Sequence, residues 1–362
     1  MNKRKVLVAM SGGVDSSVAL SLLLDQGYQC IGVTMKLWEH KDPVSKVARN
    51  SDCNTVEAIN GAKLVCDRLG VHHYTLDFMD VFKENVVDDF SEQYLLGRTP
   101  NPCVRCNSIV KWDTLIRQAN VLGIDYISTG HYARIHKQNN RAFIKKGLDT
   151  FKDQSYMLWQ INQNTLNRTL LPLGEMTKDE TRDYAIKHGL ETAQKPESMD
   201  LCFVNGDDYS KFLNEIMPEK MNSVKPGEVK DEDGNTVGQH TGFTNYTIGQ
   251  RKGIGVSFPE PRYVKKINPL DNSIVIARKD NMYTDHCYIS NPNWFIPEPV
   301  DNLNTFAKIR YNSKGSNATI SKVNDTFKVD FSNPQLAVTP GQSIVFYDDN
   351  LLIGGGIIEV NC

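Results

Sequence analysis

The chain has 362 residues, of which 40% are hydrophobic and 23% are charged, a composition ordinary for a globular protein of two or three domains. Its 41 Lys and Arg residues against 43 Asp and Glu residues give a formal net charge of -2, which excludes a uniformly basic nucleic-acid-binding protein. No stretch approaches the roughly 18 apolar residues of a membrane span, so we expect no membrane partner. Without an export signal, the eight cysteines favour reduced thiols and a cytoplasmic location over a disulfide framework.

The first ~150 residues alternate apolar strand patterns with amphipathic helix patterns. Strands are predicted over residues 6–10, 30–35, 74–76 and 126–129, and helices over residues 16–26, from about residue 54 to Gly70, and near residues 81–96. This alternation is typical of a parallel sheet with helices on both faces. Such sheets bind ligands at the carboxyl ends of their strands, and the segments AMSGGVDSS (9–17) and STGHYAR (128–134) both begin there.

The remainder of the chain changes character twice. Residues from 158 to about 213 have the pattern of short helices, and after Gly227 short alternating segments are separated by Gly, Pro, Asn and Asp. The latter pattern is typical of small antiparallel barrels. We therefore expect an α/β protein with a parallel-sheet domain over residues 1–215, including a helical adaptor over about 158–215, a small central β-barrel over 216–278 and a C-terminal β-barrel over 279–362.

The segment AMSGGVDSS joins the first predicted strand to the first predicted helix. Gly12 and Gly13 allow a close approach to the backbone N–H groups at a helix N-terminus, which together form an anion site. The serines add hydroxyl donors, and Asp15 is suited to organising the turn or binding a magnesium ion. The dinucleotide fingerprint and the Walker loop are both absent, since the loop is not GxGxxG and the chain contains no Gly-Lys dipeptide. The alternative is a tight strand–helix turn with a serine cap.

The letters SGGVDSS resemble the signature of the ATP pyrophosphatases, the PP-loop family. The resemblance implies an adenine nucleotide α-hydrolase-like domain that cleaves ATP between its α and β phosphates. In that family the loop holds the departing pyrophosphate while AMP is transferred to a carbonyl oxygen of the substrate. The loop therefore indicates the chemistry and leaves the substrate open.

The segment GRTPNPCVRCNSIVKW (97–112) contains a Cys-x-x-Cys pair, Cys103 and Cys106. On its own this spacing fits a redox pair, half of a metal site or a structural role, and the chain has no second pair that would complete a zinc site. The preceding Pro-Asn-Pro predicts an extended, exposed backbone. No acidic residue lies between Arg98 and Lys111, so local positive charge is expected to lower the thiol pKa values from about 8.5 toward neutrality.

Several segments in a matching order resemble the family of tRNA-specific 2-thiouridylases over essentially the whole chain: AMSGGVDSS, TPNPCVRCN, STGHYAR, KDQSYML, MDLCFV, YTIGQRKGIGV, TPGQS and GGGIIEV. The resemblance implies that the 2-oxygen of the wobble uridine in tRNA is replaced by sulfur. A uracil oxygen is a poor leaving group, so it must first be adenylated by ATP, and AMP then leaves when sulfur attacks the carbon. Magnesium is expected beside the phosphates.

Carried over position by position, the resemblance implies three groups of binding residues. Contacts with ATP are expected from Ala9, Met10, Ser11, Gly12, Gly13, Val14, Asp15, Ser16, Met35 and Gly130. Of these, Met35 also suits a core methionine and Gly130 a turn glycine. The target base is expected to meet Asn101, Pro102 and Cys103. Contacts with tRNA are expected from Lys152, Asp153, Gln154, Arg310, Tyr311 and Gln342.

The resemblance also implies the catalytic groups. Cys106 is expected to be the nucleophile and Cys202 to carry the persulfide sulfur, which leaves a transient Cys106–Cys202 disulfide. His131 is expected in the active site as an acid, a base or a phosphate contact, the alternative being a packing histidine. The remaining cysteines are predicted to have no chemical role: Cys30, Cys53, Cys66, Cys287 and Cys362.

Cys103 stands where some members of the family carry an aspartate, which puts a carboxylate acid or base at this position in doubt. Cysteine transfers a proton if its pKa is near neutral. Alternatively, Cys103, Cys106 and Cys202 together would hold three irons of a [4Fe–4S] cluster. We favour the persulfide route, because the resemblance already explains two of these three cysteines.

The partners implied are tRNA, through its anticodon region, and an upstream protein that donates persulfide sulfur; we expect the protein itself to be a monomer. Residues 251–279 carry seven basic residues against two acidic ones, which fits a track for RNA phosphates or a solvated barrel face. Two other functions stay open. One is an ATP pyrophosphatase that adenylates a small metabolite, and the other is an RNA-binding scaffold with an inactive nucleotide loop.

Overall fold

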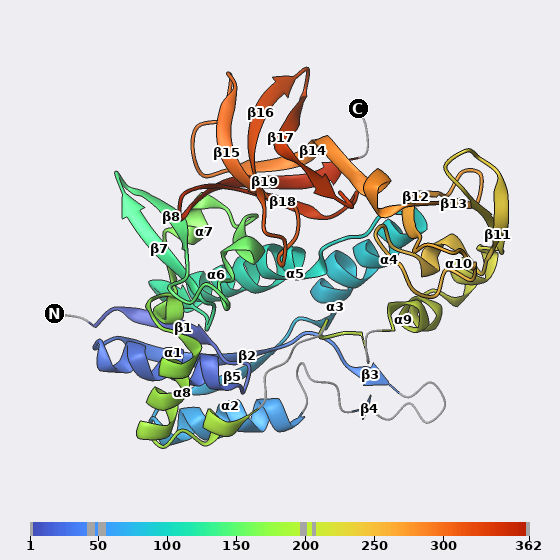
Figure 1. Ribbon diagram of the computed structural model, residues 1–362. Coiled ribbons are helices and arrows are strands. Elements are labelled where there is room, and N and C mark those ends of the chain that lie inside the picture. The colour runs from blue at the N-terminus through green and yellow to red at the C-terminus, as the bar shows by residue number, and fades with distance from the viewer. Residues whose placement is uncertain (1–2, 42–47, 50–55, 196–200, 205–207, 360–362) are drawn as a thin grey trace. The chain divides into compact units, whose positions relative to one another are not determined.

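The computed structural model describes residues 3–41, 48–49, 56–195, 201–204 and 208–359 (Figure 1). The chain forms two compact units. The first comprises residues 1–86, 103–207 and 350–353, and the second comprises residues 87–102, 208–349 and 354–362. A parallel sheet lies in the first unit, whereas β-rich domains make up most of the second, so the predicted α/β class is confirmed.

The sheet of the first unit has five parallel strands in the order β5 (His73–Asp77), β2 (Gln29–Lys36), β1 (Lys5–Ala9), β6 (Tyr126–Ser128) and β9 (Thr169–Leu170). The four predicted strands are all present, with ends displaced by at most one residue. The register aligns Val6 with Cys30 on one side of β1 and with Tyr126 on the other. The strand order therefore reverses between β1 and β6, and sheets of this kind bind ligands beyond the carboxyl ends of such strands.

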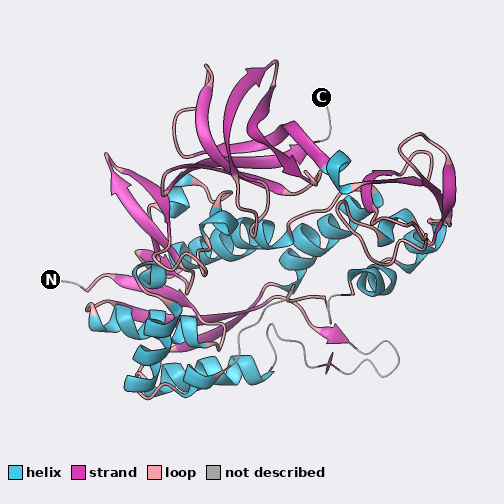
Figure 2. Ribbon diagram, viewed as in Figure 1, coloured by secondary structure: helices cyan, strands magenta, loops and turns pink. Residues whose placement is uncertain are grey.

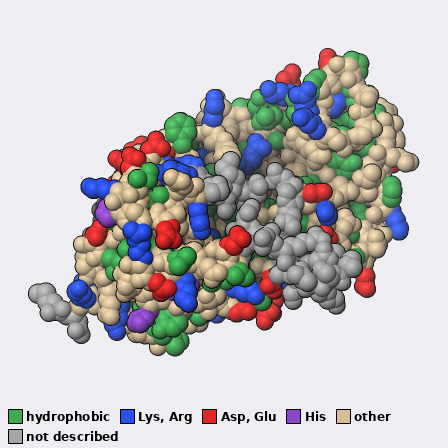
Figure 3. Space-filling model, turned by 90° about the horizontal axis from the view of Figure 1, so that it is seen from below, with side chains coloured by type: hydrophobic (Ala, Val, Ile, Leu, Met, Phe, Trp, Pro, Cys, Tyr) green, Lys and Arg blue, Asp and Glu red, His purple; other side chains and the backbone are tan. Residues whose placement is uncertain are grey.

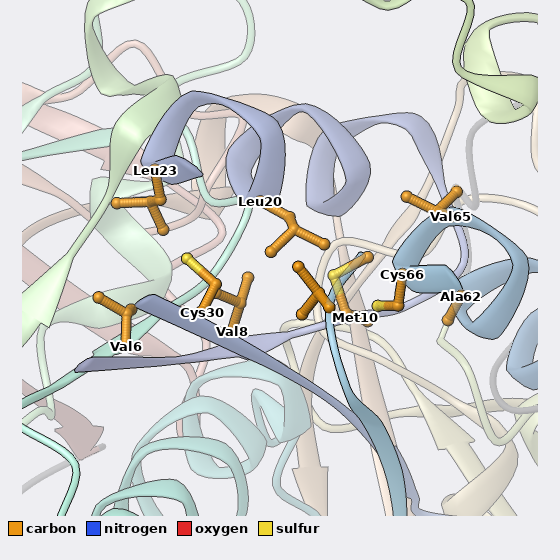
Figure 4. Packing of buried hydrophobic residues seen from close by; sticks show 10 residues of the cluster. Val6, Val8, Met10, Leu20, Leu23, Cys30, Ala62, Val65 and Cys66 are labelled. Carbon is orange, nitrogen blue, oxygen red and sulfur yellow. The ribbon is translucent and has the colours of Figure 1, made fainter. Parts of the chain in front are cut away.

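Side chains on one face of this sheet pack against α1 (Val14–Asp25) and α2 (Val56–Arg68) (Figure 4). Val6, Val8 and Met10 share this face because side chains alternate along a strand. Leu20 and Leu23 of α1 point toward them. Burial of each large apolar side chain contributes roughly 1.5–3 kcal/mol, so this core fixes both ends of the connection between β1 and α1.

The helix predicted near residues 81–96 contains a π-helical turn. α3 (Met79–Phe82) leads into the π segment η1 (Lys83–Val87), which continues as α4 (Asp88–Leu95). In this turn the Asn85 carbonyl accepts a hydrogen bond of 2.8 Å from Arg105 Nε. A second continuous helical stretch consists of α5 (Pro102–Arg105), the π segment η2 (Cys106–Trp112) and α6 (Asp113–Val121). Short π segments of this kind are frequent at functional sites.

Two antiparallel pairs also belong to the first unit. β3 (His40–Lys41) pairs with β4 (Ala48–Arg49) between β2 and α2. β7 (Ala133–Gln138) and β8 (Arg141–Lys146) form a hairpin that the sequence pattern did not predict. Asn139 and Asn140 turn this hairpin with φ angles of 49° and 62°, as a type I′ turn requires.

The predicted run of short helices after residue 158 is present. In the first unit it consists of α7 (Gln163–Leu166), α8 (Lys178–Lys187) and the 3₁₀ turn η5 (Glu191–Gln194). In the second unit it continues as α9 (Tyr209–Ile216) and α10 (Pro218–Ser223). α8 begins with a capping box, in which the Thr177 hydroxyl accepts from Glu180 N and the Glu180 carboxylate accepts from Thr177 N. This box fixes the start of α8, the element that brings Lys178 to the site described below.

The central β domain is a four-stranded sheet in the order β11 (Thr236–His240), β10 (Gly227–Lys230), β13 (Ser273–Ala277) and β12 (Tyr263–Asn268). The prediction of purely antiparallel pairing is wrong here, because β10 and β13 run parallel. The long connection over residues 241–262 carries the chain past the sheet, so that β12 enters beside β13 and not beside β11.

The C-terminal β domain is a closed six-stranded antiparallel barrel, drawn as magenta arrows in Figure 2. Its strands follow the order β14 (Tyr283–Trp294), β17 (Thr326–Leu336), β16 (Ser316–Val323), β15 (Leu303–Lys308), β18 (Ser343–Asp348) and β19 (Leu351–Glu359). Pairing of β14 with β19 closes the barrel and leaves no unpaired edge. Across the part of the chain that the structure describes, no helix combines the length and the apolar character needed to span a bilayer.

Candidate active site

Two loops meet at the carboxyl ends of β1 and β6. The first contains residues 10–13, and the second contains residues 129–132. A Cβ atom added to Gly130 would lie 2.9 Å from both the carbonyl carbon of Asp15 and the amide nitrogen of Ser16. Gly130 therefore permits backbone contact between the second loop and the first turn of α1 that no larger residue would allow, at the point where such a sheet binds its ligand.

The conformation of the first loop depends on Gly12. Its φ angle is +76°, and an added Cβ atom would lie 2.3 Å from the carbonyl oxygen of Ala58. Gly13 differs, because its φ is −95° and an added Cβ atom would meet only Ser11 Oγ, at 3.5 Å. The fold thus requires glycine at position 12, whereas at position 13 it leaves room for a methyl group.

The N-terminus of α1 has no side-chain cap. Gly13 is the N-cap residue, and among the residues that the structure describes no side chain is found to accept a hydrogen bond from the first turn. The serines are used inside the loop: Ser16 Oγ accepts from Ser11 N and donates to Gly13 O, and Ser17 Oγ also donates to Gly13 O. The alternative of a serine-capped turn is therefore wrong, and backbone N–H groups at the start of a 12-residue helix are left to bind an anion.

Asp15, in the first turn of α1, is held by two residues that the sequence pattern did not indicate. Lys178 Nζ lies 2.6 Å from Asp15 Oδ1, and the Tyr132 hydroxyl donates to the same oxygen at 2.8 Å. Lys178 is only 7% exposed, whereas the Asp15 side chain is 34% exposed, so the lysine end of this ion pair is shielded from water. Among the described residues, none bonds to Asp15 Oδ2. One carboxylate oxygen is thus fixed and the other is available to a ligand.

A second lysine reaches the loop from the end of η5. Lys195 Nζ donates a hydrogen bond of 3.0 Å to the carbonyl oxygen of Gly12. It also lies against α2, since a Cβ atom added to Gly61 would come within 2.6 Å of it. Neither Lys178 nor Lys195 belongs to a motif used in the sequence analysis. Both are far from the loop along the chain, so the sequence does not indicate that they contact it.

The other residues expected to bind ATP lie on the framework of this loop. The Met10 side chain is in the sheet core and its carbonyl accepts from Thr34 Oγ1. Val14 packs in the cluster between α1 and α8. Met35 is buried near the end of β2, and Ala9 ends β1. Contact of any of these residues with a nucleotide stays a prediction.

His131 lies in the second loop, with its ring centre 5.2 Å from that of Trp112. Its Nδ1 is 2.8 Å from Thr129 Oγ1. Burial, and secondarily the positive charge of Lys111, lower the pKa of His131 from 6.5 to about 3. The imidazole is therefore neutral at physiological pH, and among the roles left open by the sequence an imidazolium acid is the one that this environment opposes.

The same pKa shift predicts that His131 destabilises the protein in acid. Because the folded pKa of about 3 lies below the unfolded value of 6.5, the unfolded chain binds the proton first and stability falls as pH drops below 6.5. Between pH 7 and pH 5 the expected loss is at most about 2 kcal/mol. Urea unfolding of His131→Asn at both pH values should show a smaller loss than wild type. An identical pH dependence of the two proteins would contradict this assignment.

The Cys-x-x-Cys pair lies on a helix. Pro102 starts α5, so Cys103 and Cys106 are one helical turn apart on the same side. Cys106 is 6% exposed and Cys103 is partly exposed. The predicted exposure of the preceding Pro-Asn-Pro is wrong: Pro100 and Pro102 are buried, because proline at the first helical position packs its ring without losing a backbone hydrogen bond.

Polar contacts anchor η2 to the chain that follows β8. Asn107 Nδ2 donates to Met157 O, Ser108 Oγ donates to Gln160 Oε1, and Trp112 Nε1 donates to Thr169 Oγ1. Asn107, Ser108 and Trp112 are buried, so loss of the Asn107 or the Trp112 contact would leave an unsatisfied polar group. The segment carrying Cys106 is therefore held rigidly on the first unit.

Gln342 holds the backbone just before Asn101. In the second unit, Gln342 Nε2 donates to the carbonyl oxygens of Thr99 and Pro100 at 2.9 and 3.0 Å. Thr99 N in turn donates to Pro340 O at 2.9 Å. Gln342 was expected to touch RNA or the nucleotide region, and the contact found here positions the entry to the predicted base-binding residues.

The Cys202 segment packs on α3. Phe203 is buried and makes an edge-on ring contact with Phe82, at 5.6 Å between ring centres. η2, which begins with Cys106, also contacts α3. Both catalytic cysteine candidates thus belong to segments that pack on one helix, and Cys202 itself is partly exposed.

The cysteine environments also test the cluster alternative. Within the described residues, which include Cys103, Cys106 and Cys202, no three His, Cys, Asp or Glu side chains are placed to hold a metal. Burial raises the pKa of Cys30 to about 11, and that of Cys66 and Cys287 to about 12, which opposes thiolate formation. Cys53 and Cys362 lie outside the described residues.

All three residues in the predicted tRNA segment 152–154 have structural contacts, and Lys152 N donates to Asp149 Oδ1 at 3.1 Å. Asp153 Oδ1 accepts from Gly147 N and Ser155 N. Gln154 Oε1 accepts from Tyr132 N at 2.9 Å. The segment is thus tied to the loop of His131, and Lys152 is partly exposed beside it.

The two barrel residues expected to contact tRNA lie after β15. Arg310 Nη2 donates to Leu336 O at 2.9 Å, which holds the guanidinium against β17. Tyr311 is partly exposed, and Lys308 Nζ lies 5.9 Å from its ring centre. Their contact with RNA stays a prediction.

The basic segment 251–279 borders a cavity of about 560 Å³, lined by Arg251 and residues 253–262. The Arg262 guanidinium lies 5.0 Å from the ring centre of Phe258. Acidic residues offset part of the charge, since Glu232 pairs with Lys265 and Glu260 pairs with Arg278. On the face drawn in Figure 3, Lys and Arg are likewise interspersed with Asp and Glu among the described residues. A surface that binds RNA phosphates here would therefore be limited to the basic residues that lack an acidic neighbour.

Replacing Lys265 and Lys266 together with alanine is expected to weaken binding of all substrate tRNAs alike. If both side chains contact phosphates, the slope of log affinity against log salt should decrease by up to ~2. Lys265 should contribute less than Lys266, because Glu232 already neutralises it at 3.4 Å. Filter binding across a salt series measures the slope, with Lys322→Ala, which also removes an exposed lysine paired with a glutamate, as the control. An unchanged slope would show that neither lysine contacts a phosphate of the RNA.

Comparison with known proteins gives the family. The model described as "tRNA methyl transferase HUP domain" matches residues 4–206, and those described as "tRNA methyl transferase PRC-barrel domain" and "Aminomethyltransferase beta-barrel domain" match residues 210–278 and 284–358. The tRNA-specific 2-thiouridylase MnmA of Carboxydothermus hydrogenoformans is 46% identical over 99% of this chain and 98% of its own. The chain belongs to the tRNA-specific 2-thiouridylase family. MnmA of Lachnoclostridium phytofermentans is 44% identical over 98% of this chain and 99% of its own. The family resemblance drawn from the motifs is confirmed.

Among solved structures, the U34-tRNA thiolase NcsA from Methanococcus maripaludis with its [4Fe–4S] cluster covers 60% of this chain and 66% of its own. The sequence identity is 17% and the TM-score is 0.35. A likeness this weak carries no argument about the sulfur chemistry of this chain.

Proposed function

We propose that the protein catalyses ATP-dependent 2-thiolation of the wobble uridine of tRNA. The observation that carries the proposal is the uncapped N-terminus of α1 at the point where β1 and β6 diverge, in a chain of the 2-thiouridylase family. This loop would receive the phosphates of ATP. The lysines at its sides, Lys178 and Lys195, would balance part of the negative charge.

In the first step the 2-oxygen of the uracil attacks the α phosphorus of ATP, and pyrophosphate leaves. Residues 11–17 would hold the departing pyrophosphate through backbone N–H groups and serine hydroxyls. Magnesium, when bound, would neutralise charge on the phosphates. Asp15 Oδ2 suits such an ion, because magnesium commonly takes one or two carboxylates and completes its shell with water and phosphate oxygens.

In the second step the terminal sulfur of a persulfide on Cys202 attacks C2 of the adenylated uridine, and AMP leaves. The Cys106 thiolate then attacks Cys202 Sγ, which forms the Cys106–Cys202 disulfide and releases the 2-thiouridine sulfur with the bonding electrons. The packing of both cysteine segments on α3 supports this pairing. An external reductant must reopen the disulfide before the next cycle.

The partners follow from the chemistry. The nucleic-acid substrate is tRNA, presented through its anticodon region, and a persulfide-carrying protein supplies sulfur to Cys202. We propose that the protein acts as a monomer in the cytoplasm. Residues 152–154, Arg310 and Tyr311 are the proposed contacts to RNA, and Gln342 would act by holding the backbone before Asn101.

Pyrophosphate release measured with and without bulk tRNA separates this function from the two alternatives. The thiouridylase should release pyrophosphate in response to tRNA. An enzyme that adenylates a small metabolite should ignore tRNA, and an RNA-binding scaffold should release none under either condition. Absence of a tRNA response would therefore overturn the proposed function.

A further inference from the structure

Tyr132 connects the segment 152–154 directly to Asp15. Its backbone is bonded on both sides by one residue: Tyr132 N donates to Gln154 Oε1 at 2.9 Å, and Gln154 N donates to Tyr132 O at 2.8 Å. Its hydroxyl donates to Asp15 Oδ1 at 2.8 Å, and the residue is 2% exposed. A displacement of Gln154 must therefore move Tyr132, because its backbone and side chain are both enclosed.

A second connection runs from the same stretch of chain to the same oxygen. Asp149 Oδ1 accepts from Phe151 N and Lys152 N, and Asp149 Oδ2 accepts from Lys178 N at 3.0 Å. The Lys178 side chain then reaches Asp15 Oδ1 at 2.6 Å. The Lys178 backbone N–H thus contacts the turn before Lys152, and the Lys178 ammonium group contacts Asp15. Lys178 therefore links the two segments.

Both connections end on one atom. Asp15 lies in the first turn of α1, next to the uncapped N–H groups, so its orientation decides where its second oxygen points. When RNA contacts residues 152–154, it restricts their motion, and both connections transmit that restriction to Asp15. A ligand that orders the loop of a second ligand lowers the entropy that the second must lose on binding.

We propose that Tyr132 and Lys178 are positioning residues that couple tRNA binding at residues 152–154 to ATP binding at residues 11–17. The inference rests on the proposed function, because it needs tRNA to contact residues 152–154 and ATP to occupy the loop. Coupling of this kind is reciprocal, so tRNA raises the affinity for ATP by the same factor by which ATP raises the affinity for tRNA. The enzyme would then bind ATP tightly mainly when the substrate RNA is present.

The test is Tyr132→Phe, which removes only the hydroxyl that bonds to Asp15. The ring stays in the cluster with Val14 and Leu173, so the fold should be unaffected. Lys178 is less suitable for substitution, because its removal would leave the Asp15 carboxylate without its buried partner. Tyr184→Phe is a matched control, since the Tyr184 hydroxyl bonds to Ser21 and to Asp25 at the far end of the same helix.

Binding of α,β-methylene-ATP, which the enzyme cannot cleave, is measured by calorimetry with and without saturating substrate tRNA. In wild type and Tyr184→Phe, tRNA should tighten analogue binding by roughly tenfold. In Tyr132→Phe the factor should fall below about twofold, while the affinity for tRNA alone and the melting temperature stay at the wild-type values. Thermal melting of each protein identifies a variant that fails through loss of fold.

The outcomes separate the coupling from the proposed function. If wild type does not bind tRNA or the analogue at all, the proposed function falls and the coupling with it. If wild type binds both and shows no coupling, or if Tyr132→Phe retains the full factor, only the coupling is overturned.

Discussion

Replacing either Cys106 or Cys202 with serine is expected to abolish thiolation, by more than about a thousandfold, because a serine hydroxyl neither carries a persulfide nor opens one. Cys103→Ser should leave measurable activity, since Cys103 neither accepts nor releases sulfur in the proposed sequence. Thiolated uridine formed by purified protein, with ATP and a persulfide donor, measures all three variants. The Cys106 and Cys202 variants should still release pyrophosphate once, because adenylation precedes sulfur transfer.

The cluster alternative predicts a different pattern for the same variants. All three would be inactive, and anaerobically purified wild type would absorb near 400 nm, with the absorbance lost in each variant. The serine series is informative because Cys103 and Cys106 lie only one turn apart on one continuous helical stretch. Equal loss of activity at both positions would contradict the persulfide route.

Alanine at Gly12 and at Gly13 should impair the enzyme for different reasons. Gly12→Ala forces a Cβ atom into the Ala58 carbonyl and strains a φ of +76°. The loop should therefore change its conformation, and the melting temperature of the protein should fall. Gly13→Ala meets only Ser11 Oγ at 3.5 Å, so the melting temperature should stay within about 1 °C of wild type. Its methyl group would nevertheless stand where phosphate approaches the backbone, and ATP-dependent pyrophosphate release should fall by at least about a hundredfold.

Binding of tRNA is the control for both glycine variants, because the loop is proposed to hold phosphate and not RNA. Native gel shifts without ATP should give wild-type affinity for Gly13→Ala. Normal pyrophosphate release by Gly13→Ala would show that the phosphates of ATP do not bind at this loop. Equal loss of RNA binding and pyrophosphate release would contradict the separation of the two sites.

The parallel sheet and the position of the phosphate loop were predictable from local patterns. Apolar runs such as residues 6–10 and 30–35 alternate with helices of regular period, and the glycines lie where a strand ends. The hairpin of β7 and β8 was missed because its strands, ARIHKQ and RAFIKK, carry charge at many positions and lack a clean alternation. The parallel pair of β10 and β13 was missed because pairing between distant strands leaves no local pattern.

The residues that hold the loop could not be predicted for a similar reason. Lys178 follows Asp15 by 163 positions, and Lys195 follows Gly12 by 183, so only the folded chain brings them together. The buried state of Pro100 was likewise set by packing that the Pro-Asn-Pro pattern does not encode. By contrast, Cys30 and Cys66 were predicted to have no chemical role, and their burial in the sheet core is compatible with that prediction.

Nucleoside mass spectrometry of tRNA from cells that lack this protein tests the central claim most directly. The proposed function predicts that 2-thiouridine derivatives disappear from the wobble position, and that they return with the wild-type protein but not with Cys106→Ser. Intact 2-thiouridine derivatives in such cells, with no second thiolase present, would contradict it.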